Sequence, residues 1–216
     1  MIITDFIIVI CLMLSAFFSG MEIAFVSSNK IYLEIEKQQS GINAKLLSFI
    51  TKNPSRFIAT MLVGNNISLV IYGIFMGDRI LQILFPETLQ GLPIGIKIIL
   101  IQTLISTLII LVTAEFLPKV IFQQFSNTFM KVFAFPTAIF YFLFSPVTAM
   151  IMSISDLILM RFFSIKGDQI QFTFSKIELG NYIEEQLEST KDLDNVDSEI
   201  QIFQNALDFS EVKARE

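Results

Sequence analysis

Long runs of apolar residues dominate the first 117 positions of the sequence. Three such runs extend over residues 2–26, 57–85 and 94–117. Each run reaches or exceeds the roughly 20 residues that an α-helix needs to cross the hydrocarbon core of a bilayer. The pattern predicts three membrane-spanning helices joined by more polar connections.

A fourth apolar stretch, residues 129–163, is interrupted by prolines. Pro136 and Pro146 divide it into pieces that are each shorter than a usual span, because proline cannot continue the backbone hydrogen bonding of a helix. Hydropathy alone leaves two arrangements open for this stretch. It either crosses the bilayer or lies at its surface.

Basic residues are distributed unequally between the connections. The connection after the first run is the richer one, with Lys30, Lys37, Lys45, Lys52 and Arg56. The next connection is flanked only by Arg79 and Lys97. Because cytoplasmic loops carry an excess of Lys and Arg, the first connection is predicted to be cytoplasmic and the N-terminus to lie outside. The opening residues include one acid and no base, so we expect the first helix to remain as an anchor instead of being cleaved as a signal peptide.

The overall composition supports a membrane protein. Of the 216 residues, 53% are hydrophobic and 16% are charged, which is too apolar for an ordinary soluble domain of this length. The sequence has no histidine, and Cys11 is its single cysteine, so neither a disulfide framework nor a thiolate metal cluster is expected. The remaining metal ligands are hydroxyl, amide, carboxylate and carbonyl oxygens, which suit Mg²⁺, Ca²⁺ or Na⁺.

The C-terminal part of the sequence is strongly acidic. Residues 178–216 contain 11 acids and three bases, a net charge of −8, whereas the preceding residues carry a net charge of +3. Ser175 and Glu178 have the spacing of a capping box, and a second helix is expected over residues 198–209. A solvated helical surface is the simplest explanation of these acids.

Three polar residues interrupt the first apolar run near its end. Ser15, Ser19 and Glu22 stand at i, i+4 and i+7, so they share one face of the predicted helix. An ionisable group inside a span costs at least ~2.5 kcal/mol at mid-bilayer, so Glu22 is expected to face protein, water or an ion. The alternative is that Glu22 caps the helix end or pairs with a neighbour such as Lys30.

The second and third runs contain polar islands of their own. Asn65 and Asn66 need partners that lipid cannot supply, and they serve either an ion site or hydrogen bonding between helices. In the third run, Pro118 cannot donate a backbone hydrogen bond to the carbonyl of Ala114, which frees an oxygen beside Glu115. A carboxylate, a freed carbonyl, an amide and two hydroxyls from three helices would suit a hard cation. Broken helices line ion sites in many transporters.

The motifs FFSGMEIAF, MLVGNNI and EFLPK, in this order and at these separations, resemble the transmembrane domain of the CorC/CNNM family of magnesium transporters. The likeness covers residues 1–165, and residues 166–216 are similar to the acidic helical bundle that precedes the paired CBS modules of that family. The resemblance implies an all-α membrane protein with three spanning helices in each protomer of a homodimer. It also implies belt helices at the membrane face, which would place residues 129–163 at the interface.

The family's ion-site positions carry over to Ser15, Ser19, Asn65 and Glu115 as metal ligands. Supporting or gating roles are implied for Glu22, Asn66 and Pro118. The sequence departs from the family pattern at three places. Met21 stands where a serine is frequent, Leu69 where a second asparagine is frequent, and Ala114 where a glycine is frequent.

The function that the resemblance implies is Na⁺-coupled export of Mg²⁺ across the cell (inner) membrane. Mg²⁺ would be the bound and transported ion, Na⁺ its coupling ion, and ATP would bind only on CBS modules beyond residue 216. The bilayer and a second copy are the expected partners, with no nucleic acid. The alternative is a membrane-anchored scaffold or regulatory protein of the same family. An enzyme is not expected, because an intramembrane hydrolase would need a histidine or a Ser–Lys pair in register.

Overall fold

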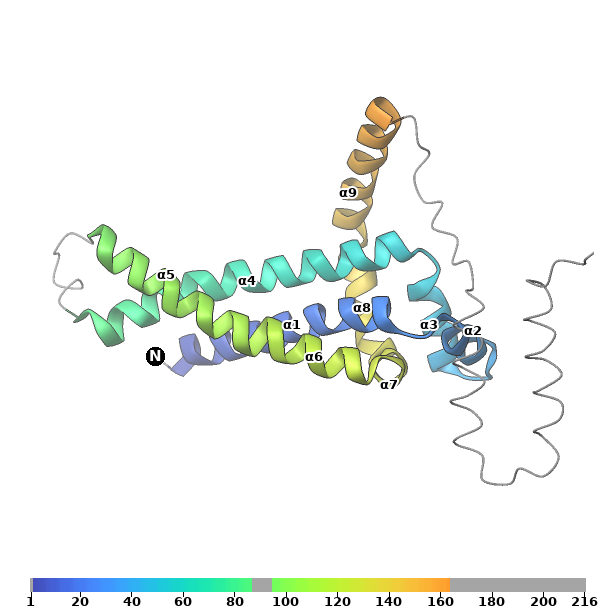
Figure 1. Ribbon diagram of the computed structural model, residues 1–216, viewed down its shortest axis with the longest axis horizontal. Helices are drawn as coiled ribbons and strands as arrows, with labels where there is room; N and C mark the ends of the chain where they lie inside the picture. The colour runs from blue at the N-terminus through green and yellow to red at the C-terminus, as the bar shows by residue number, and fades with distance from the viewer. Residues whose placement is uncertain (1, 87–94, 164–216) are drawn as a thin grey trace, which may run out of the picture. The chain divides into compact units, whose positions relative to one another are not determined.

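The computed structural model describes residues 2–86 and 95–163, and all regular secondary structure within these ranges is helical (Figure 1). This confirms the predicted all-α fold for the described part of the chain. The chain divides into two units, of which the first comprises residues 1–28 and 40–170 and the second residues 29–39 and 171–216. The predicted helices of the acidic tail lie outside the described residues.

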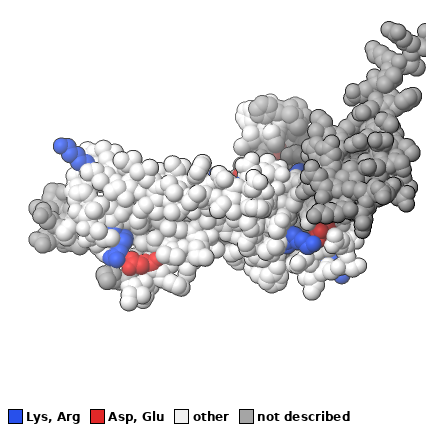
Figure 2. All heavy atoms as spheres, turned by 60° about the horizontal axis from the view of Figure 1, so that its bottom comes forward, with Lys and Arg blue, Asp and Glu red and all other residues white. Residues whose placement is uncertain are grey.

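The predicted spans correspond to three long helical segments of the first unit. The first is α1, Ile2–Ser27, and the second is α4, Pro54–Leu84. The third consists of α5, Ile96–Ile110, the π-helical η2, Leu111–Phe116, and α6, Leu117–Gln124. Figure 1 shows the three running alongside one another, with α4 opposite in direction to the other two. Figure 2 shows the broad uncharged surface along these helices on the face that it draws.

The interface between α1 and α4 has a continuous antiparallel register. Side-chain pairs mark it from the N-terminal end of α1 to its C-terminal end, namely Asp5–Arg79, Ser15–Asn65 and Phe25–Phe57. Between the first two pairs, Tyr72 is fully buried against Ile8 and Cys11. The Tyr72 hydroxyl donates to the Ser106 carbonyl at 3.3 Å and so joins α4 to α5.

The third segment contributes little to the core. No residue of α5 is buried, although 10 of its 15 residues are apolar and are distributed around the whole helix. A helix that is apolar on all sides is stable only where its surroundings are apolar as well. The exposed side of α5 is therefore suited to lipid or to another membrane helix.

Shorter helices follow the third segment, and we call them the belt helices: α7, Ser126–Val132, α8, Ala134–Leu143, and α9, Ser145–Ile158. Pro136 and Pro146 lie in the first turns of α8 and α9, so the predicted division of this stretch by its prolines is confirmed. Together with η3, Leu159–Phe163, α9 is long and apolar enough to be a fourth candidate span among the described residues.

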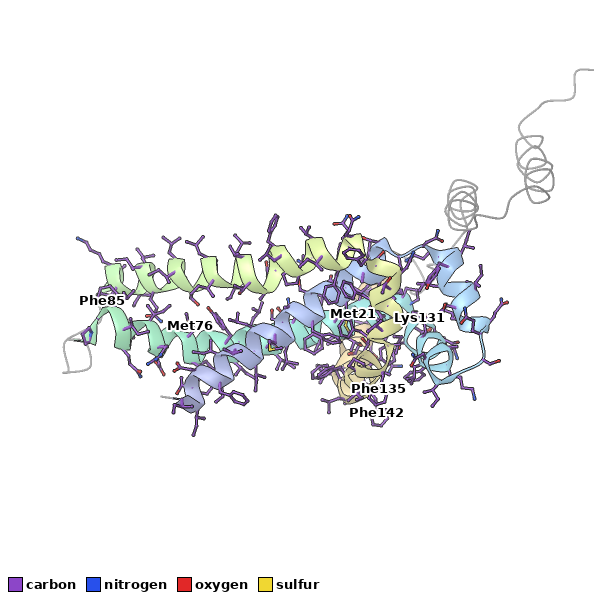
Figure 3. The ribbon with its side chains drawn as sticks, turned by 90° about the horizontal axis from the view of Figure 1, so that it is seen from below. Met21, Met76, Phe85, Lys131, Phe135 and Phe142 are labelled. Atoms are coloured by element: carbon purple, nitrogen blue, oxygen red, sulfur yellow. The ribbon has the colours of Figure 1, made fainter. Side chains whose placement is uncertain are left out.

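Figure 1 shows α9 lying across the direction of the three long segments. Transmembrane helices tilt by only about 20° on average. With α1, α4 and the third segment as the spans, α9 would lie along the membrane plane. Phe135 and Phe142 of α8, which Figure 3 labels in the region of the belt helices, are 60% and 77% exposed.

Two helices connect α1 to α4. In the first unit, α3, Ile42–Thr51, packs against α8. The ring centroids of Phe49 and Tyr141 lie 5.3 Å apart in this contact. Gly41 precedes α3 with a φ of +151°, a conformation that favours glycine. In the second unit, α2, Lys30–Gln38, is capped by the Asn29 side chain.

Candidate cation site

The middle of the α1–α4 interface contains a buried polar contact. The Ser15 hydroxyl donates to the Asn65 side-chain oxygen at 2.6 Å. Ser15 is 0% exposed and Asn65 is 9% exposed. The helical register explains the contact, because both residues fall on the faces that α1 and α4 turn toward each other. Two of the predicted ligands are thus in direct contact.

Ser19 lies one helical turn beyond Ser15 on the same face of α1. It is 0% exposed, and its hydroxyl has no hydrogen-bond partner among the described residues. Among other buried hydroxyls, Ser68 and Thr60 donate to carbonyls four residues earlier at 2.9 and 2.7 Å, whereas the Thr137 hydroxyl of α8 also has no partner among the described residues. An unsatisfied buried polar group costs about 1–3 kcal/mol and calls for an explanation such as a bound ion or water.

Glu115 belongs to η2, where the third segment departs from α-helical geometry. The Leu117 N–H donates to the Val112 carbonyl, five residues earlier. Pro118 follows and has no N–H, so the carbonyls of Thr113 and Ala114 receive no hydrogen bond from residue 118 in either register. The loss of a hydrogen bond from residue 118 to the Ala114 carbonyl could be predicted from the sequence, whereas the π-helical turn was not predicted. Single π-helical turns are frequent at functional sites. In the sequence, Pro118 was the residue that could have indicated this irregular turn.

The height of Glu115 in the bundle follows from a contact between α1 and α6. These helices pack together and run in the same direction, and Gly20 meets the ring of Phe122. Met13 precedes Gly20 by seven residues, and Glu115 precedes Phe122 by seven residues, which is about 10 Å along each helix. Glu115 therefore lies near the level of Met13 and Ser15. The Glu115 side chain is partly buried. No hydrogen bond between described residues joins it to the other three predicted ligands.

The supporting residues of the prediction lie in different environments. Glu22 is partly buried. Lys119 of α6 attracts its carboxylate electrostatically, a partner that differs from the neighbour Lys30 named in the alternative above. Pro118 is buried. Asn66 is exposed, on the same stripe of α4 as Leu62 and Val70, so the structure does not bring it to the Ser15–Asn65 contact.

The departures from the family pattern also lie in the bundle. Met21 and Ala114 are both 0% exposed, and Figure 3 shows Met21 where α1 reaches the belt helices. Within residues 2–86 and 95–163 no three Cys, Asp or Glu side chains converge on one point. A cation here would therefore meet hydroxyl and amide oxygens with one carboxylate nearby, a donor set that suits hard cations.

The family described as the cyclin M transmembrane N-terminal domain matches residues 6–198. The chain belongs to this family. Its resemblance to the CorC/CNNM proteins is thereby confirmed, and it is an all-α membrane protein.

A curated relative of this cyclin M domain is the UPF0053 inner membrane protein YfjD of Escherichia coli. It is 28% identical over 176 residues, which cover 80% of this chain and 38% of the relative. The chain thus spans less than half the length of this relative. That relative is named as an inner membrane protein, in keeping with the apolar helices described above.

Proposed function

We propose that the chain is the membrane domain of a divalent cation transporter with Mg²⁺ as its cargo. Ser15, Ser19, Asn65 and Glu115 would supply the oxygens that hold the ion during its passage. The observation that carries this proposal is the buried Ser19 hydroxyl, which has no partner among the described residues and lies one turn from the Ser15–Asn65 contact. Membership of the cyclin M family supports it.

The Ser15–Asn65 hydrogen bond is compatible with a bound cation. Ser15 donates its proton, so the lone pairs of its oxygen stay available, and the Asn65 oxygen keeps one lone pair after accepting. The Ser19 oxygen is free to turn its lone pairs to the same point. The bond then holds two ligands in place before the ion arrives.

The charge of the site suits transport more than storage. Glu115 would contribute one negative charge to a divalent cation, and the other three ligands are neutral. Oxygen sites with fewer charged ligands bind divalent cations more weakly. A weakly held ion can also leave, which a transporter requires. In more detail, we propose that the protein exports Mg²⁺ in exchange for Na⁺ entry and that its N-terminus lies outside the cell.

A second copy of the chain is the proposed partner. Asn66 is an exposed amide on an otherwise apolar stripe of α4, with Leu62 at 42% and Val70 at 64% exposure. Side-chain amides in hydrocarbon find hydrogen bonds on other helices. A homodimer packed over this stripe would provide such a partner.

Flux measurements in liposomes test the transport proposal. Glu115→Gln keeps the shape of the side chain and removes its charge, so Mg²⁺ flux should fall to the background of empty liposomes. Thr113→Val is the matched control, because Thr113 is exposed in the same π-helical segment and only donates to the Ile109 carbonyl. It should transport like the parent.

Two outcomes would contradict the proposal in different ways. Parental flux through Glu115→Gln would remove Glu115 from the site. No Mg²⁺ flux through the folded parent would favour the membrane-anchored scaffold, in which the polar residues only lock helices together.

A further inference from the structure

Two phenylalanine rings rest directly on glycines of the bundle. A Cβ added at Gly20 would lie 2.6 Å from the ring of Phe122, and a Cβ added at Gly64 would lie 2.6 Å from the ring of Phe18. Each glycine is the immediate chain neighbour of a candidate ligand, after Ser19 in α1 and before Asn65 in α4. The rings therefore touch the helix backbones within one residue of the candidate site.

The belt helices also contact both rings. Phe122 stacks on Phe129 of α7 with ring centroids 4.3 Å apart. Phe18, which is 1% exposed, packs edge-on against Phe140 of α8 with centroids 4.8 Å apart. Each ring thus contacts both a glycine and another aromatic ring. A phenyl ring is rigid, so each ring limits how closely the helix that carries it can approach the helix of the glycine.

We infer that Phe122 and Phe18 are specificity-determining residues of the cation site. The first sets the distance of α1 from α6, and the second sets the distance of α1 from α4. Together they fix the width of the space among the candidate oxygens, and with it the discrimination of Mg²⁺ from the larger Ca²⁺. The inference rests on the proposed function and adds to it the basis of ion selectivity.

The magnitudes support this role. Oxygen ligands lie at about 2.0–2.1 Å from Mg²⁺ and at about 2.3–2.6 Å from Ca²⁺, a difference of a few tenths of an ångström. A methyl group on Gly20 or Gly64 would require the facing ring to retreat by roughly 0.9 Å to reach an ordinary carbon contact of about 3.5 Å. One methyl group therefore displaces the helices by more than the difference between the two ions.

The experiment compares three glycine variants of the full chain in lipid nanodiscs. Gly20→Ala and Gly64→Ala introduce the methyl group beneath the rings. Gly73→Ala is the matched control, since a Cβ at Gly73 on the same helix α4 meets nothing within 4 Å. Apparent Kd values for MgCl₂ and CaCl₂ are measured by calorimetry at matched ionic strength.

The expected result is a change in the ratio of the two Kd values. In Gly20→Ala and Gly64→Ala the preference should move toward Ca²⁺ by about tenfold, because a wider site suits its longer bonds. In Gly73→Ala the ratio should equal that of the parent. A purely structural role of the rings would weaken both ions alike and leave the ratio unchanged, which would overturn the inference.

A second pair of variants covers the case in which a single glycine substitution fails to fold. Phe122→Leu removes the rigid spacer and should reduce discrimination by itself. Combined with Gly20→Ala, the leucine makes room for the new methyl group, and the parental ratio should return in large part. Parental discrimination in folded Phe122→Leu would contradict the inference. If the parent itself binds neither ion, the proposed function fails instead.

Discussion

Replacement of Ser19 by alanine should stabilise the ion-free protein and abolish its response to Mg²⁺. The Ser19 hydroxyl is fully buried and without a partner among the described residues, so it destabilises the folded state when no ion is bound. The cost of such a group is about 1–3 kcal/mol. Taking about 1 kcal/mol, Ser19→Ala should raise Tm in the presence of a chelator by roughly 2–4 °C for a chain of this size.

The order of stability should invert when Mg²⁺ is added. A ligand at a concentration 100 times its Kd stabilises a protein by about 2.7 kcal/mol, which exceeds the gain from removing the hydroxyl. The parent should then be the more stable protein, whereas Ser19→Ala should gain little. Cys11, the single cysteine, is buried at 5% exposure, so a thiol-reactive dye reports unfolding directly.

Ser68→Ala is the control for this measurement. Ser68 is also buried in the bundle, at 3% exposure, but its hydroxyl donates to the Gly64 carbonyl at 2.9 Å. Its removal should leave Tm unchanged or lower it, and the Mg²⁺ shift should persist. The reasoning is refuted if Ser19→Ala lowers Tm in chelator, or if it keeps the full shift with Mg²⁺.

Three further predictions concern other parts of the chain. Arg79→Ala should lower stability by less than about 1 kcal/mol in chemical denaturation, because its ion pair with Asp5 is partly exposed; a larger loss would mean that this pair clamps α1 to α4. Cysteines at positions 40 and 189 should both react with an impermeant label only from the cytoplasmic side, and labelling from opposite sides would refute the three-span topology. Asn66→Cys should form a disulfide between copies under mild oxidation, and a product that stays monomeric would contradict a dimer over this stripe.

The long helices could be predicted from the sequence because hydropathy reports directly on spans. The first two apolar runs match α1 and α4 to within three residues at each end, whereas the third run stops seven residues before the end of α6. The prolines divide the belt helices as expected. The orientation of neighbouring polar residues could not be predicted. Asn65 and Asn66 are adjacent, and the first is buried while the second is exposed. In a helix that is apolar on every side, the sequence does not tell which face meets protein and which meets lipid.

The packing around the candidate site was even less accessible to sequence analysis. The chain has 23 phenylalanines, and nothing in their spacing indicates that Phe122 and Phe18 rest on glycines. The π-helical turn was not predicted either, although Pro118 lies two residues beyond it, because a proline alone does not tell which hydrogen-bond register precedes it. The ligand residues themselves could be proposed from the sequence alone, because they are polar residues within long apolar runs.

The register between α1 and α4 also has a consequence for the order in which the protein is made. Every pair that marks this register, from Phe25–Phe57 to Asp5–Arg79, lies within the first 79 residues. Translation proceeds at about 5–20 residues per second, so the ribosome needs several more seconds to finish the third segment. During that interval α1 and α4 can already pair as a helical hairpin in the membrane, with Ser15 bonded to Asn65. The third segment would then dock on a preformed surface, guided by the hydrogen bond from Tyr72 to Ser106.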